Sequence, residues 1–273
     1  MANRKLVDGG GPVLTRAKIV LSFRGSGWTT GTFSTSDARR AFEATLDSPY
    51  LSHLVQYRGI RRAEIVFSTE DTSNIGTLGP DPRHFVAGNI WLVPDEDIRN
   101  VVRDAVRVRP PQDNEEVFYL VVISQDPIPI VPEVSDASGY HNTFEENGRT
   151  IVFGVLLNQS ANSAEKTWHY LPGIFSHELV EACTDPNVTS GYRFEDGNEI
   201  CDLDEDRPVE LLGLGREVTL AAYWSDLEEA AVVPTTYSLR VALGKRSTEV
   251  IPSVRAAIQG TSVRNTILAG CNS

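Results

Sequence analysis

Apolar runs too continuous for a half-exposed sheet recur along the first part of this chain. Val117 to Ser124 and Ile151 to Leu157 are almost uninterrupted apolar segments, which is typical of strands that are covered on both faces. Ala17 to Phe23 and Ala63 to Phe67 are predicted as two further strands. A sheet with both faces covered needs helices on each side, so the chain is expected to fold into an α/β structure.

Two amphipathic segments between these strands supply such helices. Ser36 is predicted to cap a helix that carries Ala38, Ala41 and Phe42 at helical spacing. Asp95 to Val106 is predicted as a second helix with one apolar face. The order is therefore β-α-β-α-β before a proline-rich interruption.

No internal repeat or linker divides the chain, which predicts a single domain over residues 1–273. Its sheet-and-helix part is expected over about 13–160, and a less regular part over about 161–273. We expect Ile151 to Leu157 to be the edge strand, placed to receive an extended peptide by strand addition. Tyr237 to Leu243 alternates between apolar and polar residues and is predicted as a late strand.

Charge excludes some classes of partner. The net charge is −12, and the segment from Arg193 to Glu229 holds twelve acidic residues against three arginines. We therefore expect neither nucleic acid nor a membrane surface as a partner. The acidic segment is typical either of a solvated loop or of a cation site, because carboxylate oxygens are the ligands that hard cations prefer.

Targeting and redox signals are few. No apolar run reaches the roughly 18 residues of a membrane span, and the start from Met1 to Lys5 leads into Asp8 and glycines rather than into a signal peptide. This favours a cytoplasmic location. Three cysteines are too few for a disulfide scaffold; a Cys183–Cys201 bridge is left open, and Cys271 has no assigned partner.

One helix carries the residues with the clearest chemistry. Leu171 to Pro186 is predicted as a helix, with Pro172 in its first turn and Pro186 beyond its end. Most of its surface is apolar. A polar stripe crosses it at steps of four residues: His177, Glu181 and Asp185.

This stripe nearly reproduces the zinc-peptidase motif H-E-x-x-H. In that motif the residues at i and i+4 ligate the metal, and the glutamate at i+1 holds the attacking water. His177 and Glu181 would then be metal ligands and Glu178 the general base, with a carboxylate in place of the second histidine. The alternative is a surface helix that only forms ion pairs.

A downstream segment, Asn198 to Asp202, resembles the gluzincin pattern of thermolysin-like peptidases. The resemblance implies that Glu199 is the third metal ligand, so that it would converge on one ion with the two helix ligands. It also implies that Asp202 or Asp185 orients the histidine from outside the ligand shell. The spacing from Glu199 to Asp202 is three residues, one shorter than in that family.

The two remaining histidines near these motifs, His141 and His169, are predicted as hydrogen-bond donors to the reacting group or as alternative ligands. A metzincin site is excluded. It needs a third histidine in the motif and a methionine turn, whereas the only methionine of the chain is Met1.

A wider set of segments resembles the EXORDIUM/phosphate-induced protein family and its microbial relatives. Members carry S-H-E-x-x-E, T-D-P or T-N-P, and E-x-x-D segments. The resemblance implies a secreted protein whose activity the motifs do not define. It rests on Gly10 to Leu14, Gly27-Trp28, Ser52 to Tyr57, Gly139 to His141, Ser176 to Glu181, Thr184 to Pro186, Glu199 to Asp202 and Tyr223 to Ser225.

Together these patterns predict a zincin-like α/β domain with a mixed sheet and a metal-site helix. The expected function is zinc-dependent hydrolysis of a peptide or protein substrate. The alternative is a non-catalytic binding or structural protein of the same fold that holds Ca²⁺ or no metal, because one histidine and at least two carboxylates are a harder ligand set than a typical zinc site.

Overall fold

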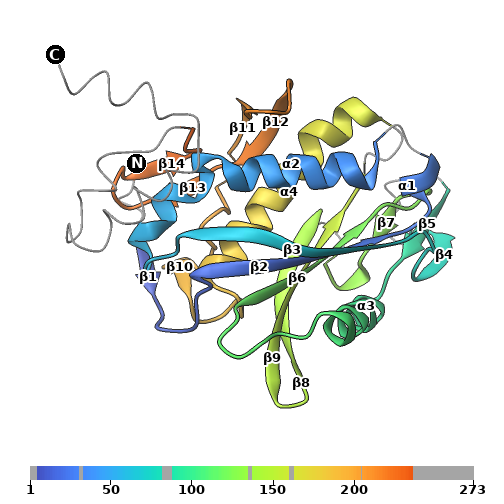
Figure 1. The fold of residues 1–273 in the computed structure, drawn as a ribbon, viewed down its shortest axis with the longest axis horizontal. Coiled ribbons are helices and arrows are strands. Elements are labelled where there is room, and N and C mark those ends of the chain that lie inside the picture. Colours follow the sequence, from blue (N-terminus) through green and yellow to red (C-terminus); the bar gives the residue numbers. More distant parts are fainter. Residues whose placement is uncertain are drawn as a thin grey trace.

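A five-stranded mixed sheet organises the computed structural model, which describes residues 5–30, 33–81, 88–134, 137–159, 163–203 and 205–235. The strand order is β3-β2-β6-β9-β8 (Figure 1). Its strands are β2 (Arg16–Arg24), β3 (Arg62–Asp71), β6 (Val117–Ile123), β8 (Gly139–Glu146) and β9 (Arg149–Leu157). The α/β class and the four strands expected from apolar runs are confirmed. The predicted strand at Tyr237 to Leu243, and Cys271, lie outside the described residues.

The edge strand differs from the prediction. β9, which contains Ile151 to Leu157, lies inside the sheet, parallel to β6 and antiparallel to β8. The edge strand is β8, joined to β9 by a tight turn in which Asn147 and Gly148 have φ of 51° and 73°, as a type I′ hairpin requires. β9 is continuously apolar because it has a neighbouring strand on each side and a covered face above and below. β8 has one neighbouring strand and is mostly polar, so its sequence does not stand out as a buried strand.

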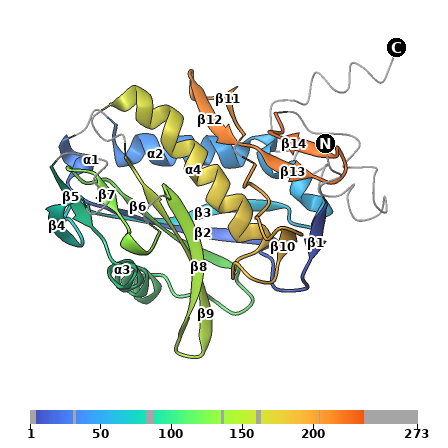
Figure 2. The same cartoon turned by 180° about the vertical axis from the view of Figure 1, so that it is seen from behind.

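Helices cover both faces of the sheet, as the apolar runs predict. α2 (Thr35–Asp47), the 3-10 helix η1 (Pro49–Gln56) and α4 (Ala164–Thr184) contribute to one core, and α3 (Asp95–Val108) to the other, so that α4 and α3 lie on opposite sides (Figures 1 and 2). Along β2, Ile19 and Leu21 pack into the first core and Val20 into the second. The short helices α1 (Gly27–Thr30) and η2 (Pro132–Val134) lie at the ends of strands.

The start of α2 lies two residues before the predicted N-terminus. Ser34, not Ser36, is the N-cap: its hydroxyl accepts the backbone N–H of Asp37, and the Asp37 carboxylate accepts the backbone N–H of Ser34. This reciprocal pair is a capping box, which satisfies two backbone donors, whereas a cap at Ser36 would satisfy one.

α4 begins two turns earlier than predicted. Ser163 caps it by accepting the backbone N–H of Lys166, and Pro172 lies inside the helix rather than in its first turn. Trp168 and Leu171 are buried in the main core, so the turns before the proline are anchored by packing that offsets the one lost backbone hydrogen bond. After the proline, Phe175 stacks on Phe42 of α2, with ring centroids 4.1 Å apart.

Short strands complete the structure around α4. The hairpin of β11 (Asp206–Glu210) and β12 (Glu217–Ala221) packs along the side of α4 that faces away from the sheet (Figure 2). The backbone N–H of Ala221 in β12 donates to Ser176 Oγ of α4 at 2.9 Å. The first strand, Leu6–Asp8, precedes the predicted sheet-and-helix part, which was expected to begin at about residue 13. It pairs with the late strand Tyr192–Phe194 and so belongs with the C-terminal part. The short strands are β1 (Leu6–Asp8) with β10 (Tyr192–Phe194), β11 (Asp206–Glu210) with β12 (Glu217–Ala221), β13 (Tyr223–Ser225) with β14 (Ala230–Val232), and β4 (Thr77–Pro80), β5 (Asn89–Leu92) and β7 (Pro129–Ile130) in one sheet.

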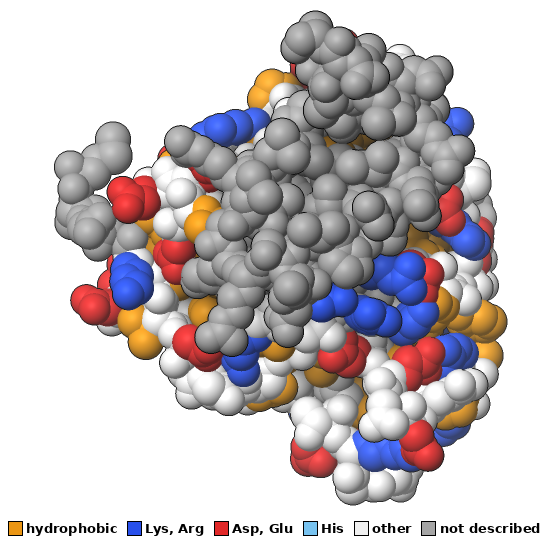
Figure 3. All heavy atoms as spheres, turned by 60° about the vertical axis from the view of Figure 1, so that its left-hand side comes forward, with side chains coloured by type: hydrophobic (Ala, Val, Ile, Leu, Met, Phe, Trp, Pro, Cys, Tyr) orange, Lys and Arg blue, Asp and Glu red, His pale blue; other side chains and the backbone are white. Residues whose placement is uncertain are grey.

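Charged side chains of both signs lie beside one another on the face shown in Figure 3. Exposed pairs such as Arg39 with Glu43, 2.8 Å apart, are common among the described residues. Each contributes about 0–1 kcal/mol to stability. None of the described helices has the length and apolar character that crossing a membrane requires.

Candidate metal centre

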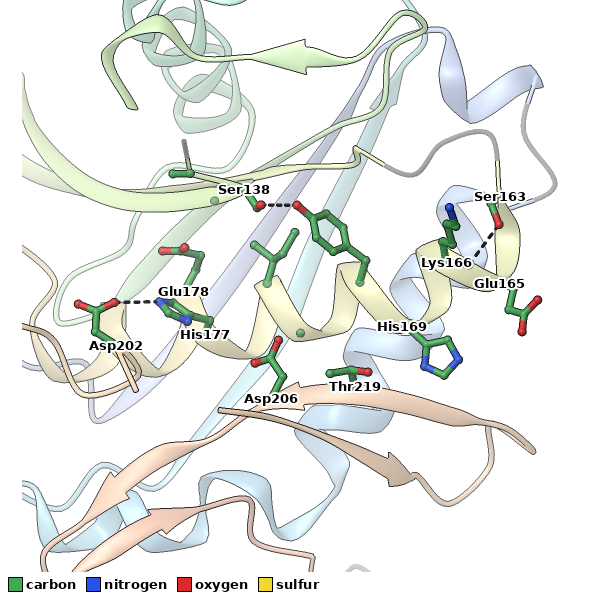
Figure 4. Close-up of a pocket in the computed structure, with 15 residues that line it drawn as sticks. Ser138, Ser163, Glu165, Lys166, His169, His177, Glu178, Asp202, Asp206 and Thr219 are labelled. Carbon is green, nitrogen blue, oxygen red and sulfur yellow. Dashed lines mark hydrogen bonds and ion pairs between the residues drawn. The ribbon is translucent and has the colours of Figure 1, made fainter. Parts of the chain in front are cut away.

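A pocket of about 970 Å³ runs along α4 and ends at His177 and Glu178 (Figure 4). On one side its wall is the segment that leads into β8, where the Tyr170 hydroxyl donates to Ser138 Oγ. On the other side the hairpin supplies Asp206 and Thr219. The pocket therefore joins the edge of the main sheet to the helix motif.

His177 and Glu181 meet at the inner end of this pocket, as their spacing on one helix face requires. His177 Nε2 lies 3.2 Å from Glu181 Oε2 and 3.7 Å from Asp202 Oδ1. Glu181 is buried and His177 is half-buried. We call His177 and Glu181, with the neighbouring residues Glu199, Cys201 and Asp202, the helix site.

The segment after β10 is held against the helix by its own backbone. The Cys201 N–H donates to Glu181 Oε1 at 3.2 Å, and the Glu199 N–H donates to Asp202 Oδ2 at 2.9 Å. Three groups of described residues have donor atoms within 4.8 Å of one another: His177, Glu181 and Cys201; Glu181, Glu199 and Asp202; and His141, Glu178 and Glu181. The predicted set of His177, Glu181 and Glu199 is not among these groups; Glu181 instead belongs to all three.

Glu199 has an unusual environment for a carboxylate. Its Oε1 atom is buried and accepts no hydrogen bond from the described residues. The nearest cationic group in an ion pair with it is His141, whose Nε2 is 3.5 Å away. Leaving a buried carboxylate oxygen without a partner costs free energy, which a bound cation would recover.

His141 reaches the site from the edge strand β8, and its side chain is 2% exposed. Its Nε2 lies 3.0 Å from the backbone oxygen of Asp185, so this nitrogen donates a hydrogen bond there. Its Nδ1 faces two carboxylates, with Glu178 Oε2 at 3.3 Å and Glu181 Oε2 at 3.9 Å. Sequence spacing only suggested His141 as an outer or alternative ligand, because the pairing of β8 with β9 that places it here was not predicted.

Asp185 and His169 take other positions than expected. The Asp185 carboxylate is buried, accepts the N–H groups of Ser190 and Gly191, and pairs with Arg193, so it does not orient His177. Only its backbone contacts site residues: its oxygen accepts from His141, and its N–H donates to the backbone oxygen of Glu181. His169 lines the pocket two turns before the motif and belongs to none of the donor groups found among the described residues.

The cysteines give one residue that sequence reasoning missed. Cys183 and Cys201 are both free and buried, so the bridge left open between them is not formed. Cys201 lies in a donor group with His177 and Glu181. The sequence signal that could have identified Cys201 as a donor is its position two residues after the predicted ligand Glu199. Burial raises the pKa of the Cys201 thiol well above its ordinary value, and nearby carboxylates raise it further.

Buried charge shifts the pKa values at the site. Burial lowers the pKa of His177, but Glu181 and the other carboxylates outweigh it and raise this pKa to about 9. Burial raises the pKa of Glu181 to about 7, against the lowering effect of His177. Burial likewise opposes the charged form of His141, yet Glu178 and Glu199 raise its pKa well above the ordinary value. Without a cation, protons compensate the crowded carboxylates.

The donors fit a metal ion of the zinc type. Two ligands bound at about 2.0–2.1 Å to a tetrahedral ion lie about 3.3–3.4 Å apart. The distance from His177 Nε2 to Glu181 Oε2, 3.2 Å, is close to that separation. Imidazole, carboxylate and thiol donors within reach of one another suit a borderline cation, while the carboxylates alone would also suit Ca²⁺.

The pKa shifts predict how the stability of the metal-free protein depends on pH. Both raised pKa values mean that the folded chain binds protons more tightly than the unfolded chain. The stabilisation is present below the ordinary pKa values and is lost as pH rises through about 7 and then about 9. Urea unfolding in a chelator should therefore show the wild type losing stability relative to Glu181→Gln between about pH 5 and 9, because the variant has no carboxyl proton to release at this position and no Glu181 carboxylate to raise the pKa of His177. A wild type that gains stability relative to this variant would contradict the assignment.

Gly139 sets how closely β8 approaches the helix motif. A Cβ atom here would lie 2.5 Å from Ile174 Cγ2 and 2.9 Å from both Glu178 Oε1 and Val155 O. Gly139→Ala should therefore destabilise the fold by about 1–3 kcal/mol through overpacking, measured by urea unfolding. Gly79→Ala in β4, whose Cβ would meet only Leu92 at 3.8 Å, is the matched control and should change stability far less. Equal effects would show that the approach at Gly139 is not tight.

Comparisons of the chain with protein-family models, with curated proteins and with solved structures found no match. Function is therefore inferred from the donors themselves. Their main features are two histidine–carboxylate contacts, of which that of His141 is fully buried, a carboxylate oxygen without a hydrogen-bond partner among the described residues, and an adjoining pocket.

Proposed function

We propose that this protein is a zinc-dependent peptide hydrolase with a zincin-like fold. The observation that carries the proposal is the contact of His177 with the buried Glu181 at the end of a large pocket, with Glu178 on the same helix lining that pocket. His177 and Glu181 would hold the ion, with Glu199, Cys201 and Asp202 as the donors that complete its shell. Zinc held there would polarise the scissile carbonyl and lower the pKa of a water molecule.

Glu178 is the proposed general base. It follows His177 by one residue, about 100° round the helix, so its carboxylate lines the pocket instead of joining His177 and Glu181 at the helix site. A carboxylate at this position can accept a proton from the attacking water and pass it to the leaving amine. His141 Nδ1, 3.3 Å from Glu178 Oε2, limits the orientations open to that carboxylate.

The edge strand supports a peptide as the substrate class. The Leu157 N–H donates to Ser138 O, and hydrogen-bonded pairs alternate along an antiparallel ladder. The backbone groups of Gly139 and His141 therefore point away from β9. No described strand pairs with this side of β8, and Gly139 lines the pocket, so an extended peptide could add to the sheet beside Glu178.

The resemblance to the EXORDIUM family gains a spatial argument. Three segments on which it rests, Gly139 to His141, Ser176 to Glu181 and Glu199 to Asp202, contribute residues to one cluster although they are far apart in the chain. A shared site in that family would place its motifs together in this way. Membership of the family is thus part of the proposal.

A binding protein is the second candidate, favoured by the group of Glu181, Glu199 and Asp202, which offers only carboxylates and would suit Ca²⁺. Elemental analysis of protein purified without chelator separates the two. Zinc near one equivalent, together with cleavage of a peptide library, supports the hydrolase. Calcium alone, with no peptide cut in added Zn²⁺, supports the binding protein.

A further inference from the structure

The hydrogen bonding of His141 is compatible with a metal ligand, because a backbone carbonyl holds one ring nitrogen and the other faces two carboxylates. Metal-ligating histidines donate the N–H of the nitrogen that does not bind the ion to a carboxylate or backbone carbonyl, which fixes the ring. His141 Nε2 donates to the Asp185 carbonyl at 3.0 Å in this way. Its other nitrogen, Nδ1, is directed at Glu178 Oε2 and Glu181 Oε2.

The two carboxylates that meet His141 Nδ1 have only histidines as ion-pair partners among the described residues. In the described part of the chain, Glu178 and Glu181 form ion pairs with histidines but with no Lys or Arg. The carboxylates and His141 are all buried, with donor atoms within 4.8 Å of one another. The 3.3 Å from Nδ1 to Glu178 Oε2 matches the separation of two ligands of a tetrahedral zinc ion.

We propose that His141, Glu178 and Glu181 form a second divalent-cation position, joined to the helix site through Glu181 Oε2. That oxygen lies 3.2 Å from His177 Nε2 and 3.9 Å from His141 Nδ1, so one carboxylate faces both histidines. No donor group among the described residues contains both histidines, which favours two positions over one shared ion. One imidazole with two carboxylates selects a borderline cation such as Zn²⁺ or Co²⁺. We call these three residues the His141 position.

A cation in the His141 position would regulate the proposed hydrolase. It takes Glu178 as a ligand, so the carboxylate is no longer free to accept a proton. Excess Zn²⁺ should then inhibit peptide cleavage, a consequence that rests on the proposed function. The occupancy of the position does not rest on it, because cation binding is measured without substrate.

The experiment is a Zn²⁺ titration of the chelator-treated full chain by calorimetry, with bound metal checked by elemental analysis after gel filtration. The wild type should bind about two equivalents. His141→Gln keeps an N–H for the Asp185 carbonyl but removes the Nδ1 ligand, and should bind about one. Glu178→Gln, a milder change at the same position, should also bind about one. His169→Gln, outside both groups, is the control and should keep two.

Circular dichroism and thermal unfolding of each variant show whether it is folded, and Glu178→Gln carries the test if His141→Gln is not. One equivalent in the wild type overturns the proposal. If the wild type binds only one equivalent and both His141→Gln and His177→Ala bind none, one ion shared by both histidines replaces the proposal. Two equivalents in a protein that cuts no peptide would support the second position while contradicting the proposed function.

Discussion

Replacing Glu178 by Gln is expected to reduce peptide cleavage by about 10² to 10⁴ while the protein stays folded and keeps the cation of the helix site. Glutamine preserves the size of the side chain and its hydrogen bonding but cannot accept the proton, and loss of a general base typically costs that factor. His177 and Glu181, which hold the ion, are untouched. The rate should be measured as kcat on one peptide found in the library, with Zn²⁺ at one equivalent.

A matched control for this change lies on the same helix. Glu165 lines the far end of the pocket in the first turn of α4, so Glu165→Gln makes the same chemical change without touching the motif. It should leave kcat within a few fold of the wild type. A Glu178→Gln protein that cleaves as fast as this control would show that the activity arises elsewhere or from a contaminant.

Replacing His177 by Ala should remove both the helix-site cation and the activity. An ion bound only by the folded chain stabilises it by about 2.7 kcal/mol at a free concentration of 100 times its Kd. The wild type should therefore gain that stability on addition of Zn²⁺, whereas His177→Ala should gain only what the His141 position provides. Urea unfolding with and without Zn²⁺ measures the difference.

His169→Ala is the control for that comparison, because His169 lies on the same helix and in the same pocket but in no donor group. It should respond to Zn²⁺ as the wild type does. If the two alanine variants respond alike, His177 is not a ligand. If the wild type gains no stability from Zn²⁺ and only Ca²⁺ stabilises it, the binding-protein candidate is the better one.

The buried strands of the fold could be predicted from their apolar sequences, whereas the edge strand and the start of α4 could not. β2, β6 and β9 were recognised because strands covered on both faces read as unbroken apolar runs. β8 was missed as an edge strand because its sequence is mostly polar, with Tyr140 and Phe144 four residues apart, and so lacks the alternation that marks a half-buried strand. The start of α4 was misplaced because Pro172 normally marks a first turn, and only the packing of Trp168 shows that the helix extends before it.

The candidate site also contains residues that local sequence patterns predict and residues that only tertiary contacts bring into place. His177, Glu178 and Glu181 follow from helical periodicity, a local property that the sequence carries directly. The approach of Glu199 and Asp202 rested on resemblance, and the hydrogen bond from the Cys201 N–H to Glu181 is what brings that segment to the helix. His141 was predicted only as a hydrogen-bond donor to the reacting group or as an alternative ligand, because its contact with Glu178, 37 residues along the chain, depends on strand register.

The donors come from β8, from α4 and from the segment that follows β10, between His141 and Asp202. During synthesis the chain must therefore be made past Asp202, and the edge hairpin, the helix and the late segment must all have folded together, before any cation can be enclosed. A nascent chain that stops earlier offers the helix motif without its outer donors. Loading with metal would then be a late event in biogenesis, coupled to completion of the tertiary structure rather than to formation of the helix.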